Sequence, residues 1–144
     1  MKRLIAAAML AALAPLPALA EGMMHKLAIH VDQNDPQVMN MALNNVQNTM
    51  AYYHEKGDQV TIEIVAYGPG LNMLVEGKSP VKDRISAMAL ESDGLTFAAC
   101  GNTLEGMKKK TGADVPLLEE AVVVPSGVVR LIELQEQGYA YVRP

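Results

Sequence analysis

Short apolar runs alternate with amphipathic helical patterns along most of this chain, and this alternation limits the folds that it can adopt. Residues typical of strands fill five segments: 26–31, 60–66, 95–99, 121–124 and 139–142. The segments between them carry apolar residues three and four positions apart, the period of a helix face. Strands that alternate with helices form parallel sheets covered by helices. The sequence therefore predicts an α/β fold, a three-layer α/β/α sandwich around a five-stranded, mainly parallel sheet.

Polar residues and prolines mark where the helices begin, because both are favoured in the first turn. The predicted starts are Asp35-Pro36, Ser79-Pro80, Asn102 with Glu105 three residues later, and Ser126. The pair Asn102 and Glu105 has the spacing of a capping box. Segments 95–99 and 121–124 are almost entirely apolar, so we expect both to be central strands covered on both faces.

The first twenty residues have the pattern of a secretory signal peptide. Lys2 and Arg3 precede an apolar run that ends in a small-x-small sequence at Ala20. A membrane anchor is the alternative, but the run contains two prolines and is short for a span of about 20 residues. We expect cleavage after Ala20, a single domain over residues 21–144, a periplasmic or secreted location, and no membrane attachment after cleavage.

The charge of the chain argues against nucleic acid as a partner. The formal net charge is −4, and loss of Lys2 and Arg3 makes it −6. A nucleic-acid-binding face needs clustered lysines and arginines. The one cluster, residues 108–110, lies near a predicted helix C-terminus, where cations are favoured by the helix dipole.

Polar residues and glycines collect where the predicted strands end. In parallel sheets, ligands bind beyond the carboxyl ends of the strands. The residues that we expect at this edge as candidate ligand-binding groups are His30, Gly68, Gly70, Gly101, Asn102, Ser126 and Gly127, together with Cys100.

Cys100 is the only cysteine, so it cannot form a disulfide within the chain. A lone thiol in an exported protein is either a reactive group or a buried, inert side chain. Because this one lies between a strand and a helix N-terminus, the helix dipole and free N–H groups favour its thiolate. We therefore expect a catalytic thiol with a pKa below the ordinary value of a cysteine.

Other known types of site are not indicated. The three histidines lack convincing metal-ligand spacing, and Gly68-Pro69-Gly70 is not a dinucleotide-binding fingerprint. Ser126 lacks the surroundings of a hydrolase nucleophile and is better interpreted as a helix cap. We therefore expect neither a metal nor an organic cofactor.

Four sequence blocks together resemble the exported, single-domain branch of the DsrE/DsrF-like family. They are "ALNNVQNTM", "VAYGPGLNML", "FAACGNTL" and "VVVPSGVVRLIELQEQGYAYVRP". The resemblance implies an α/β/α sandwich that assembles into trimers or hexamers. In cytoplasmic members, a cysteine on the corresponding loop accepts sulfur as a persulfide and passes it to a partner protein, and Cys100 falls in that block.

Three functions remain open at this stage. Cys100 could carry or transfer sulfane sulfur between a donor and an acceptor protein. The strand-end residues could instead bind a small anion or metabolite, with an unreactive cysteine. The chain could also be a structural homo-oligomer, with Tyr139 and Tyr141 as part of the contact surface.

Overall fold

The computed structural model describes residues 22–144, so the predicted signal peptide lies outside the described residues. Five parallel strands form one sheet in the order β4-β3-β2-β1-β5. The strands are β1 (Met24–Val31), β2 (Gln59–Ala66), β3 (Leu95–Cys100), β4 (Ala121–Val124) and β5 (Ala140–Val142). The predicted five-stranded parallel sheet is confirmed.

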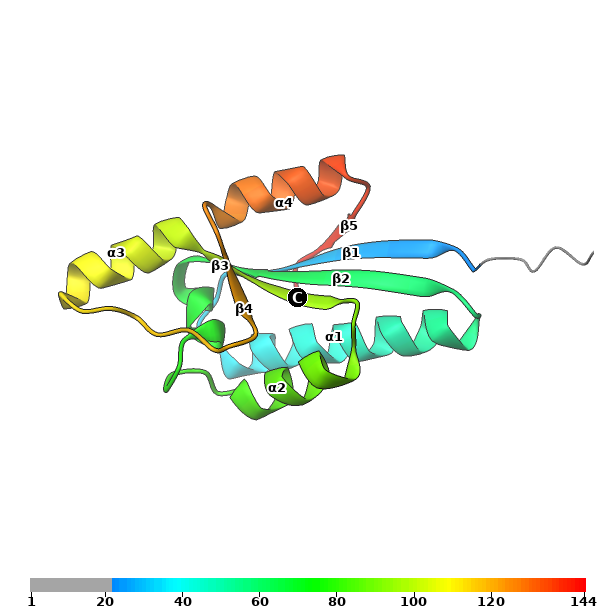
Figure 1. Ribbon diagram of the computed structural model, residues 1–144, viewed down its shortest axis with the longest axis horizontal. Coiled ribbons are helices and arrows are strands. Elements are labelled where there is room, and N and C mark those ends of the chain that lie inside the picture. Colours follow the sequence, from blue (N-terminus) through cyan, green and yellow to red (C-terminus); the bar gives the residue numbers. More distant parts are fainter. Residues whose placement is uncertain (1–21) are drawn as a thin grey trace, which may run out of the picture.

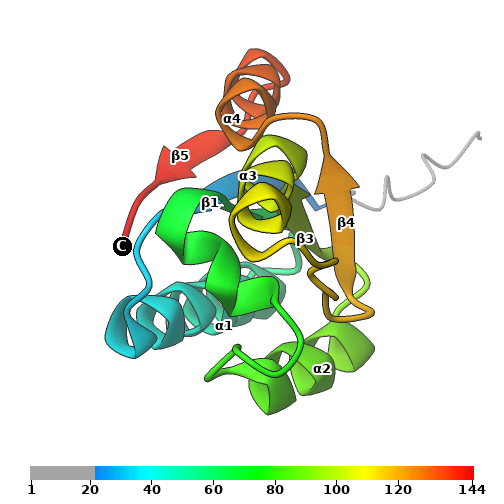
Figure 2. The ribbon, with the colours of Figure 1, turned by 90° about the vertical axis from the view of Figure 1, so that its left-hand side faces the viewer.

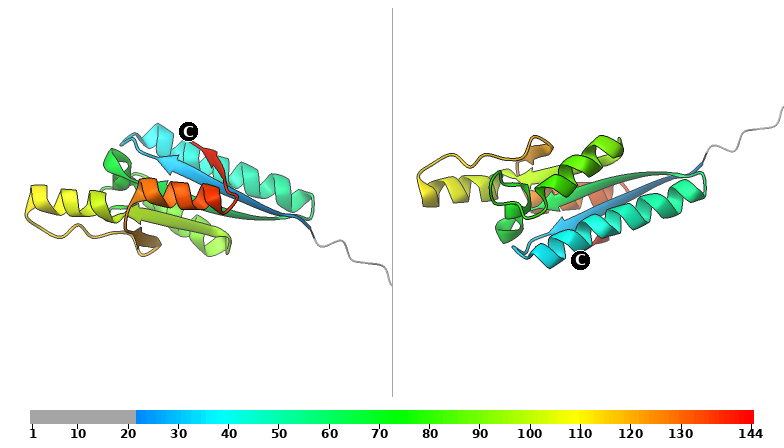
Figure 3. Two further views of the ribbon diagram at one scale, coloured as in Figure 1. Left: turned by 90° about the horizontal axis from the view of Figure 1, so that it is seen from above. Right: turned by 90° about the horizontal axis from the view of Figure 1, so that it is seen from below.

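Helices cover the two faces of this sheet unequally (Figure 1). They are α1 (Pro36–Glu55), the 3-10 helix η1 (Gly68–Leu74), α2 (Lys82–Glu91), α3 (Gly101–Thr111) and α4 (Gly127–Glu136). Helices α1 and α2 lie against one face and α4 lies against the other (Figure 3). Helix α3 projects beyond the carboxyl ends of the strands, and every one of its residues is at least partly exposed.

Two apolar cores hold the three layers together. The larger lies between the sheet and α1 and α2, and includes Ile29, Leu43, Ile64 and Phe97, each no more than 1 % exposed. The smaller lies under α4 and consists of Ala28, Val65, Ala98, Leu131 and Leu134. Two of its three strand residues are alanines, whose small side chains let a single helix pack close to the sheet. The three-layer α/β/α prediction is therefore confirmed.

The helix starts were predicted with mixed success. Asp35 caps α1 as expected, and its carboxylate accepts the Gln37 N–H at 2.7 Å. Helix α2 begins later than predicted, at Lys82, because Ser79 instead accepts the Val81 N–H in a preceding turn.

The expected cap at Asn102 is wrong. Strand β3 runs directly into α3, so Cys100 occupies the capping position and Asn102 lies within the first turn.

Strand β4 does not lie where its sequence predicted. Residues 95–99 form part of an interior strand with mostly buried side chains, as expected. In contrast, β4 is an edge strand in which Val122 is 61 % and Val123 is 54 % exposed. An apolar run shows that a strand is suited to burial, but it does not show which molecule covers it. The expectation that β4 is central and covered on both faces is therefore wrong for this chain.

Candidate thiol site at the carboxyl end of the sheet

Cys100 lies where two helices begin. It is the last residue of β3 and the N-cap of α3, and it adjoins Gly127, the first residue of α4. Figure 2 looks onto this end of the sheet and shows α3 in front, with the start of α4 above it. Helix N-termini carry partial positive charge and free N–H groups, so both helices favour an anion at this position. The thiol itself is buried, at 4 % exposure.

Gly127 allows the close approach of α4 to this thiol. A Cβ atom at this position would lie 2.8 Å from Cδ1 of Tyr67 and 3.2 Å from Cβ of Cys100. Real Cβ atoms essentially never come within 3.0 Å of another heavy atom, so any larger residue must push the helix start away. Gly127 has an ordinary helical backbone conformation. The glycine is therefore needed because it lacks a side chain, which lets α4 begin close to Cys100.

The surroundings of Cys100 shift its pKa in two directions. Burial raises the pKa of the thiol, whereas hydrogen bonds from the Thr103 hydroxyl and from the backbone N–H groups of Gly127, Thr103 and Asn102 lower it. The hydrogen bonds prevail, and the pKa lies below the ordinary value. Thr103 Oγ1 also accepts the Gly68 N–H at 2.9 Å, which leaves the hydroxyl proton available to the sulfur. The direction of this shift agrees with the sequence-based expectation.

Tyr67, which sequence analysis did not single out, links Cys100 to His30. Its side chain packs at Gly127, beside Cys100, and its ring stacks on the imidazole of His30 with centroids 4.5 Å apart. His30 is 5 % exposed, and its Nδ1 shares a 2.7 Å hydrogen bond with the Tyr141 hydroxyl. The available signal was the position of Tyr67, directly after a strand and before a glycine turn at the carboxyl edge.

The remaining predicted residues have mainly structural contacts. A side chain at Gly70 would overlap the carbonyl of Val31, and one at Gly101 would lie 3.0 Å from the carbonyl oxygen of Val124. The Asn102 N–H donates to the Pro125 carbonyl at 3.2 Å. Ser126 is the N-cap of α4, although within residues 22–144 its hydroxyl has no capping hydrogen bond. These residues shape the strand ends.

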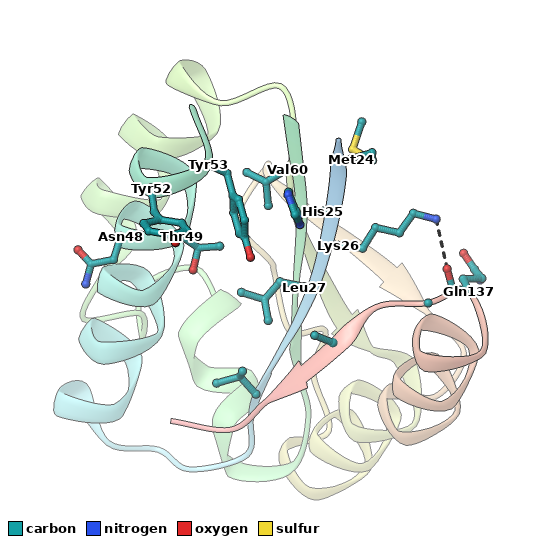
Figure 4. Close-up of a pocket in the computed structure, with 13 residues that line it drawn as sticks. Met24, His25, Lys26, Leu27, Asn48, Thr49, Tyr52, Tyr53, Val60 and Gln137 are labelled. Atoms are coloured by element: carbon teal, nitrogen blue, oxygen red, sulfur yellow. Dashed lines mark hydrogen bonds between the residues drawn. The ribbon is translucent and has the colours of Figure 1, made fainter. Parts of the chain in front are cut away.

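A large groove in the described structure is lined by residues other than Cys100. It has a volume of about 840 Å³ and runs between α1 and the β1–β5 edge of the sheet (Figure 4). Leu27, Val60 and Val142 line it together with Tyr52 and Tyr53. The candidate site residues predicted from the sequence do not contribute to this groove.

Residues 22–144 contain neither a membrane-spanning helix nor a cluster of metal-binding side chains. No helix of this part of the chain is both long and apolar enough to cross a bilayer. Nor do three or more histidine, cysteine, aspartate or glutamate side chains of the same residues gather as a metal ion would require.

Comparison with known protein families gives a match over residues 25–144, to the DsrE/DsrF-like family. The chain belongs to the DsrE/DsrF-like family. The match includes all of β2 to β5 and nearly all of β1, together with Cys100, Gly127 and His30. DsrE-like proteins are associated with sulfur relay.

A solved structure has the same DsrE-like fold. It is MTH1491 from Methanobacterium thermoautotrophicum, described as a protein of unknown function. The two chains are 35 % identical and superpose with a TM-score of 0.70 over 83 % of this chain and 99 % of the other. A comparison with curated proteins finds no match.

Proposed function

We propose that this DsrE-like protein carries or transfers sulfane sulfur through a persulfide on Cys100. The supporting observation is the position of Cys100 at the end of β3, as the N-cap of α3 and next to Gly127 at the start of α4, where the surrounding N–H groups and the Thr103 hydroxyl lower the pKa of the thiol. A thiolate is the nucleophilic form of cysteine, and this arrangement increases its share at neutral pH. Membership of a family associated with sulfur relay supports the same chemistry.

The reaction needs no redox cofactor. The Cys100 thiolate attacks the outer sulfur of a polysulfide or similar donor, a new S–S bond forms, and the donor S–S bond breaks. The bonding electrons leave with the remainder of the donor as a thiolate or sulfide. Because the chain has one cysteine, a thiolate of an acceptor protein must then attack the outer sulfur and regenerate Cys100.

Burial of the thiol limits the donor. At 4 % exposure, Cys100 is reached by small inorganic donors more readily than by a bulky protein thiol. We therefore expect polysulfide to load the protein faster than a large aromatic disulfide reacts with it.

Intact-mass measurement of the processed protein tests the proposal. After incubation with polysulfide, we expect a gain of one sulfur atom that a reductant removes and that Cys100→Ser abolishes. If the wild type acquires no sulfur from polysulfide or from thiosulfate with a reductant, the proposed function is wrong.

We further propose that the protein is exported and forms a homo-oligomer, a trimer or hexamer. The basic and apolar start of the sequence supports cleavage after Ala20. Exposed apolar side chains on the edge strand β4 and on α4 support self-association: Val122, Val123, Val128, Val129 and Ile132. N-terminal sequencing of the mature protein and light scattering test the two statements separately.

The groove between α1 and β5 supports a second candidate function, the binding of a small ligand. Its volume of about 840 Å³ lies within the usual range of small-molecule sites, and apolar and aromatic side chains line it. In this case Cys100 is unreactive until the protein unfolds. Alkylation of the native protein distinguishes the two functions, since a carrier thiol must react while the domain stays folded.

A further inference from the structure

The C-terminal strand is held to the sheet by few contacts. Strand β5 has three residues, lies at the edge, and pairs with residues 27–29 of β1. All three of its side chains are exposed. Two side-chain contacts reinforce this pairing: His30 with Tyr141, within the two strands, and Asp32 with Arg143, one residue beyond their ends. We call these four residues the C-terminal latch.

His30 is the buried part of the latch. Its Nδ1 shares the hydrogen bond with Tyr141, whereas its Nε2 is buried and has no hydrogen-bond partner within residues 22–144. The Asp32 carboxylate is 3.9 Å from Nε2, beyond hydrogen-bonding distance. Both oxygens of that carboxylate are already bound by the Arg143 guanidinium, at 3.0 and 2.9 Å.

The charged and titratable groups around His30 come from three elements. Asp32 follows β1, Tyr67 follows β2, and Tyr141 and Arg143 come from β5 and the residue after it. A proton on Nε2 would place a second cation beside an aspartate that Arg143 already neutralises. The added charge would remain in a site 5 % exposed, where it loses most of its hydration.

We infer that the C-terminal latch is released by protons: protonation of His30 detaches β5 from β1 while the rest of the sheet stays folded. Detachment of Tyr141 and Arg143 gives the imidazolium access to water and to the freed Asp32 carboxylate. His30 also stacks on Tyr67, whose side chain packs at Gly127 beside Cys100, so the latch lies one residue away from the surroundings of the thiol. The inference does not depend on the sulfur chemistry, because it concerns different atoms.

The effect of pH on the latch follows from the number of protons that the closed and detached states bind. Burial lowers the pKa of His30 in the closed latch, Asp32 partly opposes this effect, and Arg143 adds to it. The closed state therefore binds fewer protons than a detached state with an ordinary imidazole pKa of about 6.5. As the pH falls below that value, the ratio of detached to closed molecules rises, by at most about ten-fold per pH unit for one proton.

Amide hydrogen exchange of the full processed protein tests this inference. Between about pH 7 and pH 5, the range in which histidine titrates, the protection factors of residues 140–142 should fall by several-fold more than those of β2 and β3. In His30→Gln, the β5 protection factors should no longer depend on pH. The matched control is His25→Gln, on the same strand but at its opposite end beside Asp58, which should retain the wild-type pH dependence.

A pH-independent β5 in the wild type, or equal pH dependence in the wild type and His30→Gln, would overturn the inference. Because His30→Gln removes a buried ring and could unfold the protein, the wild type supplies a second measurement. The pH midpoint of the β5 protection loss must coincide with the His30 titration followed by NMR of its ring. Different midpoints would show that another group controls the strand.

Discussion

Replacement of Gly127 by alanine tests the interpretation of the thiol site most directly. The new Cβ would lie 2.8 Å and 2.9 Å from Cδ1 and Cβ of Tyr67 and 3.2 Å from Cβ of Cys100. The Cβ atoms of Tyr67 and Cys100 are bonded directly to the backbone, so a change of side-chain rotamer cannot move them away. Either Tyr67 or the first turn of α4 must therefore shift, and we expect the helix start to move outward, away from the sulfur.

This movement has two measurable costs. Overpacking of this kind destabilises a domain by about 1–3 kcal/mol. A hydrogen bond to a charged group contributes about 1.5–3 kcal/mol, and a lengthened one loses part of that. We expect the thiolate of Gly127→Ala to lose about 1 kcal/mol of stabilisation, so the ratio of thiolate to thiol at a given pH falls about five-fold.

The assay is the pH dependence of Cys100 alkylation, together with thiolate ultraviolet absorbance and urea unfolding of the same samples. Gly106→Ala is the matched control, since an added Cβ in that part of α3 faces open space. The control should leave the pKa of the thiol unchanged. If Gly127→Ala is destabilised but keeps the wild-type thiol pKa, then the start of α4 does not stabilise the thiolate, and our account of the site is wrong.

Three further experiments, two of them with a control variant, have defined outcomes. Thr103→Val removes a hydroxyl that lowers the pKa of the Cys100 thiol, so the pKa of the thiol should rise. Thr103→Ser keeps the hydroxyl and should leave this pKa near the wild-type value. Equal thiol pKa values in the two variants would contradict a role for the hydroxyl. Arg130→Ala should reduce the free energy of unfolding, measured in urea, by about 3 kcal/mol. The substitution leaves the buried Glu63 carboxylate without its two hydrogen bonds to Arg130, at 2.7 and 2.8 Å. A loss below about 1 kcal/mol would mean that water replaces these hydrogen bonds. Ile132→Asp should lower the mass measured by light scattering to that of a monomer. The control Leu90→Asp, at an 88 % exposed site on α2, should not change this mass. An unchanged mass in both variants would exclude the exposed apolar residues of β4 and α4 from the assembly.

The sequence predicted those parts of the fold that depend on local periodicity. The stripe of Met39, Leu43 and Val46 identified α1, because helix faces repeat every three to four residues. The short, continuous apolar run at 95–99 identified β3, because such runs are typical of buried strands. The end of β3 also placed Cys100 at the start of a helix, although the cap proved to be Cys100 itself and not Asn102.

The parts that sequence analysis missed depend on contacts between distant segments. His30 meets Tyr141 only because β5 pairs with β1, and the order of strands is not encoded in any local pattern. The role of Gly127 became visible only through the atoms of Tyr67 and Cys100 that surround it. The exposure of β4 follows likewise from its place at the edge of the sheet.

Helix α3 holds the thiol at one end and projects away from the sheet at the other. Residues 108–110 near its far end are exposed, so substitutions there cost little free energy of unfolding. Selection can therefore change the far end of this helix while its first turn keeps its place beside Cys100. In evolutionary terms, the far end of α3 can change independently of the first turn, which adjoins the thiol.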